Sequence, residues 1–597
     1  MPEIAGVDPI TREIVQNALS SAADEMALAL YRTAYSTIVR DCLDYSTSLC
    51  DAEGEMIAQG VTIPFHMGSV PYAMETLLEK YGNDIEPGGI EPGGIEPGDV
   101  FIMNDPFDGG MHIPDIFIAR PIFWEGQRVA FSVSTAHHLD LGGRLPGSSA
   151  CDNTEIFQEG LRIPWLKLYH RGNPDEAIFT LLRANVRVPQ MTIGDLRAQV
   201  AACNVGERAI HDLIERYGPQ TFQACTADLI AYTERLMRAE IASWPDSTHT
   251  FTDYMDSDGV GDQPVRLQVK VTVEGDTLTA DFSGSAPQVR GALNCTRSFT
   301  VSSVTMCVRC ALREDIPNTA GMFKPLNVIT PPGTVTNVVM PGASSMRGVT
   351  GFRLVDTMFG ALAALLPDRI PAAGEGGNTL VVIGGQREDR SPYVYYELLS
   401  GTWGARPDRD GNDGLCNPAI VASNIPIEQA EAEYPVRINR YGLVKDSGGA
   451  GRFRGGLAIE REWQLLSGET HLAIRSDRRD HLPYGLYGGK PATGSTNVLH
   501  REDGEEVLPV MISTTMRGGE ILYHRQPGAG GWGDPLERVP EAVARDVKND
   551  KVSLQAARDE YGVVLGEETF EVDEGATAAL RLDKKGRRED RRKETTD

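Results

Sequence analysis

The sequence predicts an α+β protein, a large multi-lobed fold with antiparallel or mixed sheets and a helical segment near residues 192–244. Its 597 residues are too many for one simple core. Alternating apolar residues, typical of strands, recur in both halves, while helical periodicity is confined to separate segments. We therefore expect an N-terminal region at 1–190, a helical segment at 191–260, a strand-rich region at 261–535, and a C-terminal helix with a charged tail at 536–597.

The N-terminal region is expected to begin with a helix over residues 8–35. Asp8 can cap free N–H groups, and Pro9 suits the first helical position because proline lacks an N–H. Short strands joined by a turn are predicted at 44–59. The tandem Pro-Gly repeat at 85–99 cannot continue a helix or a central strand, so we interpret it as a surface loop.

One sheet is expected from the apolar runs at 100–103, 116–124 and 128–135. Helix then occupies the stretch from 192 to 244, with breaks near Gly206 and at 217–219. Apolar residues alternate on both sides of the Gly275-Asp276 turn, which predicts the clearest hairpin of the chain.

The remaining chain is expected to start with a helix near 353–366. A strand-rich, glycine-rich stretch follows and ends near 534–535. We predict a short helix over 540–561. The charged tail from 583 onward is interpreted as disordered, because it contains too few apolar residues to bury.

Charge and composition exclude several classes of function. The 57 basic and 84 acidic residues give a formal charge of -27, which disfavours binding to nucleic acid or to an anionic membrane surface. We find neither a membrane-spanning run nor a signal peptide in the sequence, so a cytoplasmic protein is expected. The pair Cys307 and Cys310 is the only CxxC among nine cysteines, and its apolar surroundings favour core packing over metal binding.

A candidate metal site lies between His66 and His138, where histidines and aspartates are concentrated. Imidazole and carboxylate ligands suit Zn, Mn or Fe. Asp115 and His137 are equally far from Gly126, the centre of a predicted hairpin turn, so they are expected to face each other across two strands. His112 is close enough in sequence to be a third ligand.

Only one of the two adjacent histidines can face such a site from a regular strand. We choose His137 and expect His138 to support the site or contact substrate. The alternative, a capping aspartate and ordinary histidines near glycine-rich loops, stays open on spacing alone. Covalent catalysis by Cys151 is a weaker alternative, because no group that would orient it is evident.

Two glycine-rich segments resemble nucleotide-binding loops without meeting their requirements. The GxGxxG at 528–533 is followed by Asp-Pro where a helix should begin, and 488–491 lacks the first glycine and the hydroxyl residue of a phosphate loop. The sequence therefore shows no ATP site of its own.

The segments DYSTSLCDAEGEMIAQ, IPFHMGSV, NDPFDGGMHIPDI, STAHHLDLGG and EIFQEGLRIP resemble the N-terminal half of hydantoinase B/oxoprolinase proteins. The segments YPVRINRYGLVKDSGGAGRFRGGLAIEREW and PGAGGWGDPLERVPEAVARDVKNDKVSLQAARDEYGVV resemble the C-terminal half. The likeness implies a divalent metal held by two histidines and two carboxylates, which match Asp51, His112, Asp115 and His137. Candidates for the general base are His138, Asp140 and Glu155.

The same resemblance implies a partner of the hydantoinase A type, which binds ATP and Mg²⁺ and phosphorylates the substrate carbonyl. The expected activity is ATP-dependent ring opening of a cyclic amide, such as a hydantoin, 5-oxoproline or a lactam, in a hetero-oligomer such as α2β2. Ketone carboxylases belong to the same family, so a carboxylase subunit is the alternative. A scaffold that only supports the ATP-binding partner is a third possibility.

Overall fold

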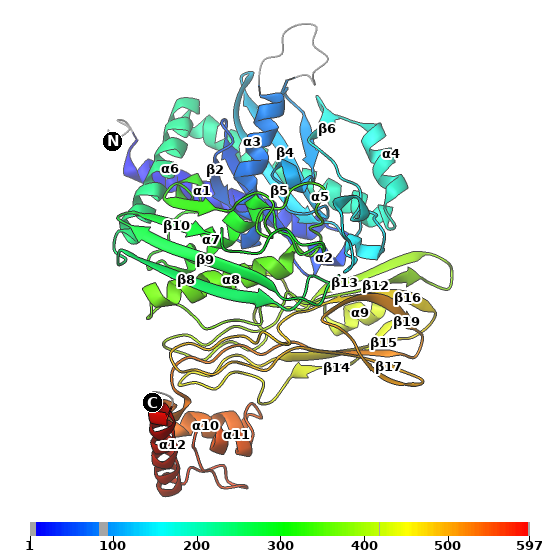
Figure 1. The fold of residues 1–597 in the computed structure, drawn as a ribbon. Helices are drawn as coiled ribbons and strands as arrows, with labels where there is room; N and C mark the ends of the chain where they lie inside the picture. The colour runs from blue at the N-terminus through cyan, green and yellow to red at the C-terminus, as the bar shows by residue number, and fades with distance from the viewer. Residues whose placement is uncertain (1–6, 83–93, 417, 595–597) are drawn as a thin grey trace.

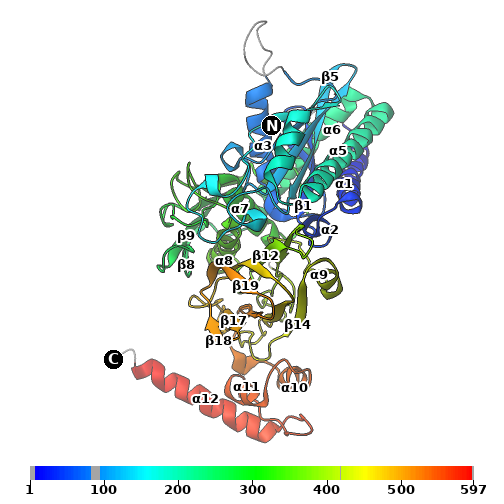
Figure 2. The same ribbon diagram turned by 90° about the vertical axis from the view of Figure 1, so that its right-hand side faces the viewer.

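The computed structural model describes residues 7–82, 94–416 and 418–594. Figure 1 shows an N-terminal lobe of helices and strands above two further sheets, with the C-terminal helices at the opposite end. Figure 2, a view at right angles, shows the same order along one long axis. Most of the Pro-Gly repeat predicted as a surface loop lies outside the described residues.

The N-terminal lobe is built on a seven-stranded sheet with the order β2-β1-β5-β4-β3-β6-β7. Its strands are β1 Tyr45–Asp51, β2 Met56–Gln59, β3 Val100–Met103, β4 Asp115–Trp124, β5 Gln127–His137, β6 Leu166–His170 and β7 Asn173–Pro174. The central strands are almost wholly buried, as expected for a sheet covered on both faces. Every pairing in this sheet is antiparallel.

Helices cover this sheet, and α5 packs on β4 and β5 while α1 packs on β1, β2 and α5. The helices of this part are α1 Pro9–Thr33, α2 Thr37–Arg40, α3 Ser69–Tyr81, α4 Glu176–Asn185, α5 Pro189–Tyr217 and α6 Pro219–Ile241. Asp8 caps α1 by accepting a hydrogen bond from the Thr11 N–H, which confirms the predicted helix start. The break between α5 and α6 is also confirmed.

Gly206 is not a helix break, contrary to the sequence prediction. It lies inside α5, where a Cβ atom would come within 2.6 Å of Met26 Sδ and 2.9 Å of Ser132 Cβ. The glycine therefore allows α5 to approach α1 and β5 closely, and packing against them stabilises the helix through this position.

The second sheet has the order β11-β10-β9-β8 and contains the predicted hairpin. Its strands are β8 Ser247–Met255, β9 Val265–Glu274, β10 Thr277–Asp281 and β11 Leu326–Ile329. The first of them, β8, lies within the segment 191–260 that was expected to be helical. Two buried helices, α7 Arg297–Ala311 and α8 Arg347–Leu365, pack on each other, and α8 also packs on β8 and β9.

Helix α8 begins at Arg347, earlier than predicted, and forms part of the core. By length and composition it is the one helix of the described chain that could cross a membrane, but 94% of its apolar window is buried inside the protein. The core helix of a protein meets the same criteria of length and composition. The burial of α8 in the core therefore explains its apolar sequence.

The C-terminal half contains a four-stranded sheet, β13-β12-β16-β19, and a five-stranded sheet, β14-β15-β20-β17-β18. Their elements are β12 Leu380–Gln386, β13 Pro392–Leu398, α9 Ile427–Glu433, β14 Val436–Leu443, β15 Ile459–Leu465, β16 Glu469–Arg475, β17 Thr496–Arg501, β18 Gly504–Val507, β19 Met511–Arg517 and β20 Ile521–Arg525. Antiparallel sheets, one parallel pairing and several helices together confirm the α+β class.

The chain ends in three helices, α10 Pro540–Lys548, α11 Leu554–Asp559 and α12 Glu574–Glu594. The single helix predicted over 540–561 is divided because Ser553 caps a new helix. The prediction of a disordered tail was wrong for the residues in α12. Arg581 donates hydrogen bonds to the carbonyls of Tyr561 and Arg538, so contacts with earlier residues hold this charged helix.

Candidate metal centre

The hairpin of β4 and β5 brings together the three residues singled out from the sequence. Asp115 is the first residue of β4, His137 is the last residue of β5, and the two are direct cross-strand partners. The predicted register is therefore confirmed. His112 lies in the turn that precedes β4, and the Asp115 N–H donates to its carbonyl oxygen at 3.1 Å, which folds this turn back on the strand.

These three side chains form the one group of three or more histidine, cysteine or acidic residues in the described chain whose ligand atoms converge. The atoms all lie within 4.8 Å of one another, and all three residues are buried. His112 Nε2 is 3.1 Å from Asp115 Oδ1, and the rings of His112 and His137 have centroids 5.1 Å apart. Two imidazoles and a carboxylate at this spacing match the ligand set of a borderline divalent metal.

His137 Nδ1 has no hydrogen-bond partner within the described residues, and His112 Nε2 and Asp115 Oδ1 have only each other, at 3.1 Å. Buried polar atoms are rarely left unsatisfied, and a cation between them would satisfy all three. Burial lowers the pKa of His112 to about 4 and that of His137 well below its usual value. Both imidazoles are therefore neutral near pH 7, which is the form that binds metals.

Burial alone would raise the pKa of Asp115, but His112 and Arg347 hold it well below its usual value. Arg347 Nη2 is 2.5 Å from Asp115 Oδ2 and leaves Oδ1 directed at the histidines. The Tyr396 hydroxyl lies 3.1 Å from His137 Nε2, and the Ser345 carbonyl lies 3.3 Å from His112 Nδ1. Each ligand is thus oriented by a group from the later part of the chain.

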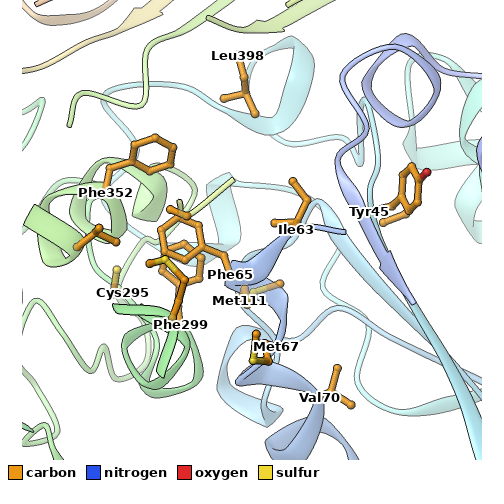
Figure 3. Close-up of a cluster of buried hydrophobic side chains, with 14 of the residues drawn as sticks. Tyr45, Ile63, Phe65, Met67, Val70, Met111, Cys295, Phe299, Phe352 and Leu398 are labelled. Carbon is orange, nitrogen blue, oxygen red and sulfur yellow. The ribbon is translucent and has the colours of Figure 1, made fainter. Parts of the chain in front are cut away.

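His112 and His137 border a small cavity of about 40 Å³, whose lining also includes Asp44, His66 and Arg475. Phe65, Phe299 and Phe352 form its apolar wall, and Figure 3 shows the three rings gathered in one cluster. The ring centroids of Phe65 and Phe299 are 4.4 Å apart. This volume is enough for an ion and about one water molecule.

Asp44 is a second carboxylate at this cavity, and the sequence reasoning missed it. Its carbonyl oxygen accepts a hydrogen bond from the His137 N–H at 3.0 Å, so it lies beside the metal-site end of β5. Burial, and then the negative charge of Asp115, raise the pKa of Asp44 to about 7. The nearby His66 has its pKa lowered to about 4 by burial.

Asp51, chosen from the resemblance, lies at the other end of β1. It pairs with Ala130, and its Oδ1 accepts hydrogen bonds from the N–H groups of Glu53 and Glu55 at 3.1 and 2.8 Å. This is the Asx-type turn that spacing alone indicates. Asp51 is seven positions along the extended strand from Asp44, roughly 23 Å, so it does not reach the three converging ligands.

Comparison with known proteins identifies the family. The model of hydantoinase B/oxoprolinase matches residues 8–535, which is most of the chain. The chain belongs to the hydantoinase B/oxoprolinase family. The β subunit of caprolactamase from Pseudomonas jessenii is 34% identical over 592 residues, which cover 96% of this chain and 99% of that subunit.

Solved structures agree with this assignment to the hydantoinase B/oxoprolinase family. The crystal structure of ATP-dependent caprolactamase from P. jessenii matches with a TM-score of 0.86 at 32% identity, covering 96% of this chain and all of that one (100%). A nucleotide-free acetone carboxylase shares the fold, with a TM-score of 0.90 at 20% identity, covering 97% of this chain and 83% of that one.

A longer relative matches in sequence. 5-oxoprolinase 1 of Arabidopsis thaliana is 29% identical over 560 residues, covering 89% of this chain and 42% of that protein.

The three residues that the sequence suggested as general bases do not line the cavity. His138 faces α5, where its Nε2 is 2.9 Å from Gln199 Oε1, in agreement with the strand alternation. Asp140 binds Arg187 and accepts hydrogen bonds from the N–H groups of Gly142 and Gly147, so it holds a loop. Glu155 precedes a short 3-10 helix and is partly exposed.

The cysteines offer no competing site in this family member. Cys151 is buried, its thiol donates to the Ile474 carbonyl at 3.3 Å, and burial raises its pKa to about 11, so it is not a thiolate near neutral pH. Cys307 is buried on α7 beside α8, and no metal-ligand group within the described residues includes it.

Proposed function

We propose that this chain is the metal-carrying subunit of an ATP-dependent cyclic amide hydrolase that opens a hydantoin, 5-oxoproline or lactam ring. The observation that carries the proposal is the convergence of the buried ligand atoms of His112, Asp115 and His137 within 4.8 Å of one another. Family membership and the likeness to a caprolactamase subunit support the reaction class. The metal is Zn, Mn or Fe, and Asp44 completes the set of two histidines and two carboxylates.

A partner subunit of the hydantoinase A type supplies ATP and Mg²⁺ binding and phosphorylates the substrate carbonyl. The name of the related protein, a β subunit, supports a heteromeric assembly. We propose an arrangement such as α2β2, acting in the cytoplasm. When bound, a divalent metal supplies a Lewis acid that polarises a carbonyl and lowers the pKa of water.

The residues of this chain have distinct roles in the proposed reaction. Tyr396 and Ser345 fix the rings of His137 and His112, and the phenylalanine wall excludes bulk water, which strengthens the electrostatic interactions in the cavity. His66 is our candidate for accepting a hydrogen bond from substrate or water, at its Nε2 atom. Its Nδ1 is fixed 2.8 Å from Ser46 Oγ, and its Nε2 lies 3.9 Å from Asp44 Oδ1.

The test compares the wild type with Asp115→Ala and His137→Ala. Metal content is measured by mass spectrometry, and ATP hydrolysis dependent on lactam, hydantoin or ketone is measured with the partner subunit, with and without bicarbonate. We expect both variants to lose metal and ring-opening activity while remaining folded. The exposed His170→Ala serves as a matched control.

Full metal content and full turnover in both site variants would contradict the proposal. Turnover that requires a ketone and bicarbonate would instead identify a carboxylase subunit. A wild-type chain that carries no metal, and is unaffected by chelation, would indicate a scaffold.

A further inference from the structure

Arg475 differs from the other buried arginines of the described chain in its partners. Each of the others forms an ion pair with at least one carboxylate: Arg347, Arg353, Arg454, Arg461, Arg478 and Arg538. Arg475 is 3% exposed and is hydrogen-bonded only to neutral oxygens within the described residues. A buried guanidinium that contacts no carboxylate is poorly compensated, which indicates a place for an anion beside it.

The hydrogen bonds of Arg475 use only some of the N–H groups of its guanidinium. Nε donates to the Asn378 carbonyl at 3.2 Å, Nη2 donates to Asn378 Oδ1 at 2.6 Å, and Nη1 donates to the Ser345 carbonyl at 3.4 Å. Five N–H groups are available on a guanidinium, so one hydrogen remains on each Nη atom. Two such hydrogens are the fork that binds two oxygens of one oxyanion.

Arg475 borders the same cavity as the candidate metal ligands. The Ser345 carbonyl that accepts from its Nη1 is the one that lies 3.3 Å from His112 Nδ1, so a single oxygen atom separates the two side chains. Arg475 ends β16, where it pairs with Leu380 of β12 and Met511 of β19. The guanidinium is therefore held by a central strand before any ligand arrives.

The charged side chains around the cavity also favour the binding of an anion. Two guanidinium groups, those of Arg347 and Arg475, line the cavity, and within the described residues only Arg347 forms an ion pair there, with Asp115. A bound divalent cation would add positive charge to this buried space. Glu159, behind Ser345, forms no ion pair with Arg475, and its Oε1 accepts hydrogen bonds from the N–H groups of Ser344 and Ser345. These positive charges therefore favour an anionic ligand.

We propose that Arg475 and Asn378 form an oxyanion-binding element that holds the phosphoryl group of the activated substrate, and afterwards the inorganic phosphate, beside the metal centre. The assignment of a phosphoryl group rests on the proposed function, whereas the binding of an oxyanion rests on the geometry of Arg475. The cavity of about 40 Å³ holds only small ligands, so phosphate enters with an outward movement of the apolar side chains, among them Ile63, Leu398 and Ile420.

The experiment measures binding of radiolabelled inorganic phosphate to the metal-loaded full-length chain by equilibrium dialysis, with bicarbonate as a second ligand. We expect Arg475→Gln to weaken phosphate binding about tenfold or more, since bonds to a charged group are lost. Arg475→Lys should retain part of the affinity. The exposed Arg437→Gln on β14 should bind like the wild type.

Asn378→Asp is a second variant that keeps the packing. The substitution puts a carboxylate oxygen where Asn378 Oδ1 now lies, 2.6 Å from Arg475 Nη2. The backbone at residue 378 has a positive φ of 43°, a conformation that aspartate tolerates. We expect it to supply the missing counter-ion, and so to weaken phosphate binding as strongly as Arg475→Gln without unfolding the chain.

Unchanged phosphate binding in both Arg475→Gln and Asn378→Asp would overturn the proposal, as would a metal-loaded wild type that binds no phosphate. Binding of bicarbonate alone would overturn the phosphoryl assignment. Metal content is measured in the same samples, and the assay needs neither partner nor cyclic amide. A failure of the proposed ring-opening reaction is therefore distinguishable from a failure of anion binding.

Discussion

Two buried charge clusters lie along helix α8, and they differ in how completely their charges are paired. In the middle of the helix, Arg353 contacts Asp477 and Asp253 at 2.5 and 3.4 Å, and Arg478 pairs with Asp253 and Asp356. At its first residue, Arg347 pairs with Asp115, while Arg475 has no carboxylate within ion-pair distance in the described chain.

The difference teaches how to separate a structural cluster from a functional one in this fold. A cluster whose guanidinium groups all contact carboxylates needs no ligand. A cluster that lines a cavity with converging metal-ligand atoms and with an arginine that contacts no carboxylate is prepared for a cation and an anion. The following substitutions test this comparison, from the largest expected effect to the smallest.

Arg353→Met should have the largest effect on folding. It leaves the carboxylate of Asp477 buried without its partner, and we expect the free energy of unfolding to fall by about 3–5 kcal/mol. Arg475→Gln leaves no carboxylate unpaired and should cost about 1–3 kcal/mol. Urea unfolding followed by circular dichroism measures both. Equal losses in the two variants would remove the distinction between the clusters.

Asp44→Asn should weaken metal binding by about 10- to 100-fold, because it removes the carboxylate of a residue that lines the cavity with His112 and His137. The matched control is Asp51→Asn, which keeps the oxygen that caps the turn at the other end of β1 and should bind metal like the wild type. Competition with a chromogenic chelator gives both affinities. The opposite ranking would restore Asp51 as the ligand.

Tyr396→Phe should weaken metal binding by about tenfold, because the hydroxyl that orients His137 is lost. Tyr393→Phe, on the same strand β13, is the control, since Tyr393 is absent from the cavity lining. The same chelator competition is used. If both variants match the wild type, the hydroxyl contact contributes nothing to the site.

Arg588→Gln should have the smallest effect. Arg588 contacts both carboxylate oxygens of Asp534 at 2.9 Å, but the two side chains are 45% and 33% exposed, so solvent screens the pair. We expect less than about 1 kcal/mol of lost stability and no change in metal content. If Arg588→Gln lost as much stability as Arg353→Met, solvent exposure would not determine how much these ion pairs contribute to stability.

The part of the site that sequence could predict is the part that depends on local geometry. Asp115 and His137 lie on strands joined by a short turn, so their pairing follows from distance to the turn. The choice of His137 over His138 follows from strand alternation in the same way. The start of α1 and the hairpin of β9 and β10 were predictable for the same local reasons.

The rest of the site depends on contacts between distant residues. Asp44 is at the site because β1 pairs with β5, and no short connection fixes that register in the sequence. Arg347, Tyr396 and Arg475 reach the cavity from other sheets and helices. A weaker signal existed for Asp44 and His66, since both lie in or beside segments that carry the family resemblance.

The cavity is also the seam between the two halves of the chain. The candidate metal ligands come from the first quarter of the chain, while Arg347 and Tyr396, which orient two of them, come from beyond residue 340. A cation bound there would hold these distant segments to one another. We expect the metal-free chain to be digested faster by a protease than the metal-loaded chain, so that metal supply would govern how long the protein survives as well as what it catalyses.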